Sequence, residues 1–141
     1  MPEVLLMKLP LELLMPSFGR VSRSRLDTCH PFWPLIMDIV IKDYDCTILC
    51  GFRGATDQLE AFEAGNSEVT WPDSTHNNEF EGEPYSLGLD VAPWPYHPND
   101  IPEFMHLAGR ILTVASFFDI KVIWGGHWKS LKDYGHFELD L

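Results

Sequence analysis

The stretch Ser86-Leu-Gly-Leu-Asp-Val-Ala-Pro93 is short, apolar and closed by a proline, a pattern typical of a strand that is largely buried. Asp90 is the one carboxylate within it. An unpaired buried charge is very costly, so Asp90 must either face solvent at a sheet edge or have a partner. The stretch therefore predicts a largely buried strand with one carboxylate, Asp90, that needs either solvent or a partner.

Helical and strand-like patterns surround this stretch without regular βαβ alternation. Apolar residues at three- and four-residue steps predict the helices, and runs of β-formers predict the strands. The predicted elements are helices over 30–42, 56–64 and 101–118, and strands over 45–52, 86–92, 121–124 and 136–141. The polar stretch 66–84 has no periodicity, so it is expected to be a functional or disordered loop. This order indicates the α+β class, a small single domain with a largely antiparallel sheet flanked by helices.

The charge balance argues against several classes of partner. The chain of 141 residues has 21 acidic and 10 basic residues, a formal net charge of −11. Phosphate binding requires clustered Lys and Arg, so a nucleic-acid partner is not expected. An anionic membrane or a wall rich in teichoic acid would also repel the chain. Affinity for a wall would therefore have to come from a specific groove.

Three cysteines are too few for the disulfide framework of a small secreted protein. Cys46 and Cys50 lie in the apolar run Cys-Thr-Ile-Leu-Cys, with an even spacing that places both on one face of a strand. We expect buried free thiols here. A zinc site built of cysteines would need partner cysteines that the sequence lacks.

Residues 1–17 are predicted to be an N-terminal extension to a domain spanning 18–141. The extension is rich in Leu and Met, but Glu3 stands where a signal peptide has a basic start, and Lys8 and Pro10 interrupt the apolar run. No stretch approaches the ~20 apolar residues of a membrane span. The expectation is a protein made in the cytoplasm without a signal peptide and without membrane insertion.

The six histidines fall into different settings. His30, His97 and His106 lie at a helix start, between prolines and inside a helix, where structural roles are expected. His76 lies in the long loop, and His136 enters a predicted strand three residues after Asp133. From the residues alone, scattered surface polar groups and a functional cluster both remain open.

Four motifs follow one another in a characteristic order. They are Ser74-x-His76, Ser86-Leu-Gly-Leu-Asp90-Val-Ala-Pro93, Trp124-Gly-Gly-x-Trp128 and Asp133-x-x-His136-Phe-Glu-Leu139. Together they resemble the phage-type L-alanyl-D-glutamate endopeptidases of the zinc D-alanyl-D-alanine carboxypeptidase superfamily. Ser24-Arg-Leu-Asp-Thr-Cys-His-Pro31 and Gly51-Phe-Arg53, followed by Gln58, are similar as well. The resemblance runs from about residue 18 to the C-terminus.

The resemblance implies roles for individual residues. The metal ligands that it implies for one zinc ion are His76, Asp90 and His136, a set of three that leaves a fourth position open for water. It also implies that Asp133 is the general base and that Arg53 binds substrate and steadies the oxyanion. The residues with an implied supporting role are Ser74 and Gln58.

Two features depart from the family pattern. Residues 77–85 form an acidic insertion, expected to be flexible, which would reshape substrate choice at the mouth of the site. His127 stands where aspartate is commoner, so it is a neutral substitute, a substrate contact or a competitor for the metal. Trp128 beside it is a candidate for substrate binding or support.

By resemblance, the activity is hydrolysis of the L-alanyl-D-glutamate bond in the peptidoglycan stem peptide. The implied setting is a lytic enzyme of bacteriophage origin, acting as a monomer at the wall, which it would reach after a holin has permeabilised the membrane or by carriage in a virion. A D-alanyl-D-alanine carboxypeptidase or dipeptidase would have the same metal set. A virion or wall-binding module without catalysis, and a purely structural metal, are further alternatives.

Overall fold

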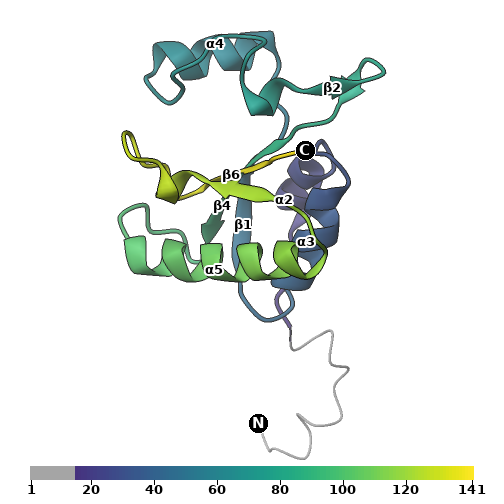
Figure 1. Ribbon diagram of the computed structural model, residues 1–141, viewed down its shortest axis with the longest axis vertical. Coiled ribbons are helices and arrows are strands. Elements are labelled where there is room, and N and C mark those ends of the chain that lie inside the picture. Colours follow the sequence, from purple (N-terminus) through teal and green to yellow (C-terminus); the bar gives the residue numbers. More distant parts are fainter. Residues whose placement is uncertain (1–14) are drawn as a thin grey trace, which may run out of the picture.

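A four-stranded antiparallel sheet in the order β1-β4-β6-β5 forms the centre of residues 15–141, the part of the chain that the computed structural model describes (Figure 1). Its strands are β1 (Cys46–Cys50), β4 (Gly88–Pro93), β5 (Val122–Trp124) and β6 (His136–Leu139). The helices are α2 (Arg20–Leu26), α3 (Phe32–Val40), α4 (Ala55–Glu63) and α5 (Ile101–Phe117). Two short 3-10 helices, η2 (Thr75–Asn77) and η3 (Gly125–His127), and a small hairpin of β2 (Glu79–Phe80) and β3 (Glu83–Pro84) complete the fold.

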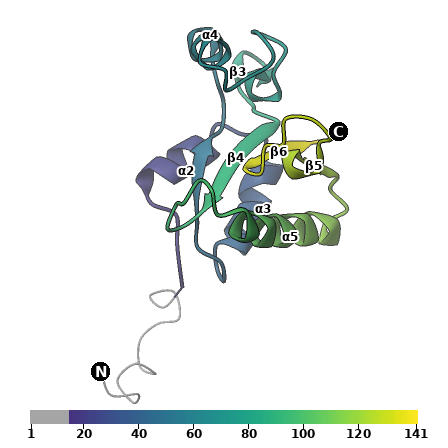
Figure 2. The ribbon, with the colours of Figure 1, turned by 90° about the vertical axis from the view of Figure 1, so that its left-hand side faces the viewer.

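One face of the sheet is buried under two helices. Leu89 and Val91 of β4 and Phe137 of β6 are fully buried on this face. The helices α3 and α5 pack against each other and supply half of the remaining buried core residues (Figure 2). Their buried residues recur at three- and four-residue steps, as expected for helices with one apolar side. Because side chains alternate along a strand, Asp90 and His136 project from the opposite face.

The helix α4 and the β2–β3 hairpin lie beyond the sheet, at the end of the molecule away from α5 (Figure 1). In the hairpin, Glu81 and Gly82 form the two-residue turn with φ of 53° and 81°. This left-handed pair matches the right-handed twist of the two flanking strands. The segment expected to be a flexible insertion therefore contains a hairpin.

The structure confirms the α+β class and the largely antiparallel sheet. The predicted helices and strands are found within a few residues of their expected bounds. The helix α2 was not predicted, and the expected loop 66–84 contains η2 as well as the hairpin. None of the helices within residues 15–141 is long and apolar enough to cross a membrane. The predicted extension 1–17 lies mostly outside the described residues, so the domain boundary stays a prediction.

The prediction of buried thiols is correct for Cys46 and wrong for Cys50, and Cys29, for which no burial was predicted, is buried as well. Cys29 and Cys46 are buried, and this burial raises the pKa of each to about 12. Cys50 is partly exposed, so the expectation that it is a buried thiol is wrong. The reason is an irregularity in the β1–β4 register, where Ile48 pairs with Val91 and Cys50 with Asp90. The extra residue between them is a β-bulge, and a bulge re-aims the side chains that follow it.

Candidate metal centre

Three neighbouring strands bring polar side chains into one row. Cys50 of β1 pairs with Asp90 of β4, and Asp90 pairs in turn with His136 of β6. The row lies on the sheet face opposite the α3–α5 layer. His136 Nδ1 is 3.0 Å from Asp90 Oδ1. The isolated carboxylate of the apolar strand therefore has a partner, as its burial requires.

His76 reaches this row from η2, outside the sheet. Ser74 caps η2 by accepting a hydrogen bond from the backbone N–H of His76 at 3.2 Å, and it completes a capping box with Asn77. A Cβ at Gly88 would lie 2.6 Å from Thr75 Oγ1 and 3.1 Å from His76 Nε2. Glycine at this position of β4 therefore makes room for the imidazole, which is only 3% exposed.

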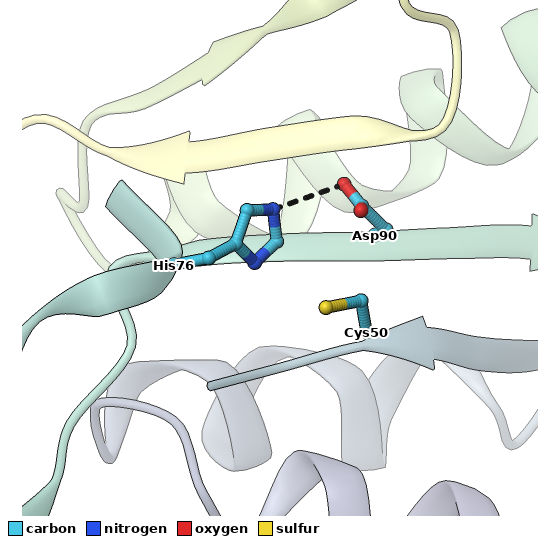
Figure 3. Close-up of side chains that lie close together, drawn as sticks. All are labelled: Cys50, His76 and Asp90. Carbon is cyan, nitrogen blue, oxygen red and sulfur yellow. Dashed lines mark ion pairs between the residues drawn. The ribbon is translucent and has the colours of Figure 1, made fainter. Parts of the chain in front are cut away.

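The donor atoms of His76, Asp90 and His136 form a nearly regular triangle. His76 Nε2 lies 3.3 Å from Asp90 Oδ1 and 3.3 Å from His136 Nδ1, and the third side is 3.0 Å. Ligand atoms held about 2.0–2.1 Å from zinc lie about 3.3–3.4 Å from one another in a tetrahedron. The observed spacing therefore fits three donors of a tetrahedral zinc site, with a fourth position left over. Figure 3 shows the edge of the triangle between His76 and Asp90.

Hydrogen bonds on the far side of each ring fix which nitrogen faces the triangle. His76 Nδ1 donates to the carbonyl oxygen of Gly51 at 2.7 Å, because a carbonyl can only accept. His136 Nε2 lies 3.1 Å from Glu138 Oε1. Such partners hold the ring orientation and leave the other nitrogen free to bind a metal.

Without a metal, the triangle binds protons tightly. Burial lowers the pKa of each imidazole, but hydrogen bonds outweigh it and raise the pKa of His76 to about 10 and that of His136 to about 9. Asp90 contributes most to both, through its hydrogen bonds and its charge, and hydrogen bonds with Cys50 and Glu138 add to the rise for His76 and His136, respectively. Burial alone would raise the pKa of Asp90, but its hydrogen bonds with His136 and His76 hold it well below its usual range. The site is thus a carboxylate between two basic imidazoles.

Asp133 lies beside the triangle, in the segment between η3 and β6. Its carboxylate is within 4.8 Å of the donor atoms of Asp90 and His136. The backbone N–H of Asp133 donates to the carbonyl oxygen of Gly125 at 3.1 Å, which anchors this segment. Desolvation, followed by the negative charge of Asp90, raises the pKa of the Asp133 carboxyl. A carboxylate with a raised pKa is a better proton acceptor for catalysis near neutral pH.

Arg53 lies beside the Asp90 corner of the triangle and is held by a buried amide. Its Nη2 lies 3.8 Å from Asp90 Oδ2, and its Nη1 donates to Gln58 Oε1 at 3.0 Å. Gln58 is fully buried, and its Oε1 also accepts from Asn77 Nδ2 at 3.0 Å. Its Nε2 donates to Ser67 Oγ and to the carbonyl oxygen of Val69. Gln58 thus links Arg53 to the loop that carries His76.

A groove of about 490 Å³ opens over these residues. It is lined by the triangle, by Arg53 and Asp133, and by residues of the loop 65–75. Trp128 lines the groove and lies with its ring centroid 5.2 Å from that of His136. His127 instead packs against Trp124, with ring centroids 4.9 Å apart, and is not among the groove residues. The groove size lies in the usual range for small-molecule or peptide sites.

Reasoning from the sequence assigned no role to three groups of the site. Glu138 supports His136, and its position two residues along the same strand is a signal for a shared face. The carbonyl of Gly51 and the thiol of Cys50 gave no such signal. The bulge in β1 directs Cys50 to the site, and a bulge has no reliable sequence pattern.

Comparisons with known proteins find one family model and a similar solved structure. The family model described as D-alanyl-D-alanine carboxypeptidase matches residues 74–139, the segment that contains every corner of the triangle. Among solved structures, the chain is similar to the Serratia marcescens L-Ala D-Glu endopeptidase ChiX, with a TM-score of 0.73 and 24% sequence identity. The match covers 93% of this chain and 96% of that one, which shows a common fold over nearly the whole length. No curated protein sequence matches the chain significantly.

Proposed function

We propose that this chain is a zinc metallopeptidase of the D-alanyl-D-alanine carboxypeptidase superfamily that hydrolyses the L-alanyl-D-glutamate bond of the peptidoglycan stem peptide, because that family's model matches residues 74–139 and the fold is similar to that of an L-Ala D-Glu endopeptidase. The proposed ligands of one zinc ion are His76, Asp90 and His136. The observation that carries the proposal is the triangle of donor atoms, with sides of 3.0 to 3.3 Å.

The donor chemistry suits a catalytic metal. Two neutral imidazole nitrogens and one carboxylate oxygen are a usual protein set for catalytic zinc. When bound, zinc would polarise the scissile carbonyl and lower the pKa of a water molecule in the site. The protein contribution is to hold the three donors at the right spacing before the ion arrives, through the backbone of Gly51 and the carboxylate of Glu138.

Asp133 is the proposed general base. Its carboxylate lies within 4.8 Å of the donor atoms of Asp90 and His136 and lines the same groove. It would take the proton of the attacking water and then return it to the leaving amine. The raised pKa of its carboxyl suits both steps.

Arg53 is the proposed substrate-binding cation. The Gln58 amide fixes the guanidinium at the groove, where its fork would bind a substrate carboxylate or a developing oxyanion. A peptidoglycan stem peptide contains such carboxylates, and the acidic chain has little other attraction for it. Ser74 and Trp128 support the site, the first through the η2 cap and the second beside His136.

The biological setting follows from the same resemblance. We propose a lytic, endolysin-like enzyme of bacteriophage origin that acts on the cell wall as a monomer and causes host-cell lysis. It would be made in the cytoplasm and reach the wall with the help of a holin. Nucleic acid is not a proposed partner, because the net charge is −11.

The main alternative is removal of the terminal D-alanine by a carboxypeptidase or dipeptidase. The description of the matching family model favours it, and the metal set is the same for both reactions. Mass spectrometry of digested, purified peptidoglycan separates them. Cleavage at L-alanine would leave stem peptides with a free D-glutamate amine, whereas release of D-alanine alone would defeat the endopeptidase proposal.

The same assay tests the general base against a catalytically silent module. Asp133→Asn should bind zinc but clear walls about 10²- to 10⁴-fold more slowly, the usual contribution of a general base. Asp140→Asn, at an exposed carboxylate just beyond β6, is the matched control and should leave the rate unchanged. Equal rates for both variants would remove Asp133 from the mechanism, and no clearance by the wild type would favour the silent module.

A further inference from the structure

Lys132 brings a second cation to the groove over the proposed zinc site. Within residues 15–141, it is the one lysine that lines this groove, and Arg53 is the one arginine. The acidic residues that line the groove are Glu68, Asp73, Asp90, Asp133 and Glu138. These carboxylates would repel an anionic part of a substrate. Apart from the proposed metal ligands, Arg53 and Lys132 are therefore the side chains of the groove that would attract one.

The ammonium group of Lys132 is held by two carbonyl groups of its own loop, which joins η3 to β6. Its Nζ donates to the carbonyl oxygen of Trp128 at 2.9 Å and to that of Gly126 at 3.1 Å. The chain turns sharply just before Lys132, since Leu131 has a left-handed φ of 40°. Holding a long side chain in place before the substrate arrives lowers the entropy cost of binding. Lys132 is therefore a cation that is fixed in advance.

The fixed ammonium still has capacity for an anion. An ammonium group has three N–H donors, and the two carbonyls accept from two of them. Arg53 lies 3.8 Å from a carboxylate oxygen of Asp90, whereas Lys132 forms no ion pair with any residue in the described part of the chain. Neutral carbonyls satisfy hydrogen bonds without cancelling the charge. A substrate carboxylate could supply both the third hydrogen bond and the missing negative charge.

We infer that Lys132 binds the α-carboxylate of the D-glutamate residue that follows the scissile bond, so that the enzyme selects stem peptides in which this carboxylate is free. This inference rests on the proposed endopeptidase function. The D-glutamate of the stem is linked to the next residue through its γ-carboxyl group, so its α-carboxylate is an anion wherever the wall does not amidate it. With this carboxylate on Lys132, Arg53 is left to face the developing oxyanion.

The place of Lys132 in the chain suits this carboxylate. Lys132 directly precedes Asp133, and both residues line the groove. Asp133 is the proposed donor of a proton to the leaving amine. In D-glutamate the amine and the α-carboxylate are attached to the same carbon atom. The cation next to the base is therefore on the leaving-group side of the scissile bond, where this carboxylate must lie.

A purely structural role for Lys132 makes a different prediction. Its two hydrogen bonds also brace the loop that carries Trp128 and Asp133. Loss of that brace would slow the cleavage of every stem peptide by the same factor. Loss of a direct contact would act only on peptides that have the carboxylate, and mainly through KM.

Two synthetic stem peptides separate these roles. Both are L-alanyl-γ-D-glutamyl-L-lysine, and they differ only in whether the α-carboxylate of D-glutamate is free or a carboxamide. The wild type should cleave the free acid with a kcat/KM about tenfold higher, a factor at the low end for hydrogen bonds to charged groups because Lys132 is exposed. Lys132→Met should lose this factor on the acid, mainly through KM, and leave the rate on the amide nearly unchanged. Lys121→Met, at an exposed lysine just before β5 and outside the groove, is the matched control and should keep the preference.

Binding of the product gives a readout that does not depend on turnover. By titration calorimetry, γ-D-glutamyl-L-lysine should bind the zinc-loaded wild type more tightly than its α-carboxamide does, and Lys132→Met should bind both equally. Circular dichroism checks that the variant is folded, and the wild-type comparison of acid with amide needs no variant.

Three results would overturn the inference while the endopeptidase proposal stands. They are equal kcat/KM of the wild type on the two peptides, a preference that Lys132→Met retains, and an equal loss by Lys132→Met on both peptides. A wild type that cleaves neither peptide between L-alanine and D-glutamate would overturn the proposed function as well.

Discussion

Replacing Gln58 with methionine tests whether one buried amide holds the groove together. Methionine has a similar length and volume, so the change removes polar atoms rather than packing. Gln58 makes four hydrogen bonds, to Arg53 Nη1, Asn77 Nδ2, Ser67 Oγ and the carbonyl of Val69, at 2.8 to 3.0 Å. Ser67 and Val69 keep a hydrogen bond to each other after the change.

The loss of stability therefore comes mainly from Arg53 and Asn77, the two other hydrogen-bond partners of Gln58. Asn77 is only 4% exposed and would keep one buried N–H without an acceptor. An unsatisfied buried donor costs about 1–3 kcal/mol, and a lost hydrogen bond to a charged group about 1.5–3 kcal/mol. Allowing for the gain from a buried thioether, we expect the free energy of unfolding to fall by about 3 kcal/mol. For a domain of this size the melting temperature should fall by about 10 °C.

Urea unfolding and thermal melts of the metal-loaded protein measure this loss. Glu60→Met, at an exposed position of the same helix α4, is the matched control and should change stability by less than about 0.5 kcal/mol. Gln58→Glu keeps an oxygen for Arg53 but sets a second oxygen against the carbonyl of Val69. It should lose stability while its KM for stem peptide rises less than that of Gln58→Met. A Gln58→Met protein as stable as the Glu60→Met control would refute this account of the groove.

Three further predictions concern the metal site. Gly88→Ala should push His76 out of place and weaken zinc binding at least about tenfold. Gly109→Ala is the control, because a Cβ at Gly109 would have no atom within 4 Å, and it should leave zinc binding unchanged. Competition with a chelator measures the zinc affinity of both variants. Glu138→Gln should lower zinc affinity by about 10- to 100-fold with the fold intact by circular dichroism, and unchanged affinity would contradict the role of this carboxylate. The pKa values of His76 and His136 in the metal-free protein are raised to about 10 and about 9. Protonation of the two rings therefore stabilises the metal-free fold fully below about pH 6.5, and this stabilisation is lost as the pH rises through 9–10. Zinc binding at pH 7 should therefore release protons, as titration calorimetry in buffers of different ionisation enthalpy would detect; binding without proton release would contradict the assignment.

Much of the fold was predictable because its signals are local. The apolar spacing of α5 and the proline-closed strand β4 depend only on neighbouring residues, and both elements were found. The helix α2 was missed because its sequence, Arg-Val-Ser-Arg-Ser-Arg-Leu, has only two apolar residues and no side-chain cap. Its buried Ser22 bonds to Thr47 of β1, a tertiary contact without a local pattern.

The candidate site was predictable only through ordered motifs. His76, Asp90 and His136 are far apart in the chain, so no spacing rule links them, and their meeting depends on sheet register. Glu138 was within reach of a strand-alternation argument. Cys50 was not, because the even spacing from Cys46 holds only for a regular strand and the bulge breaks it.

The central claim is that His76, Asp90 and His136 hold one zinc ion, and metal analysis tests it most directly. Zinc content should be measured by mass spectrometry on purified wild type and on His136→Ala, with circular dichroism as the check that both are folded. We predict about one zinc per chain in the wild type and little in the folded variant. A wild type without zinc, or a variant that keeps its full equivalent, would contradict the claim.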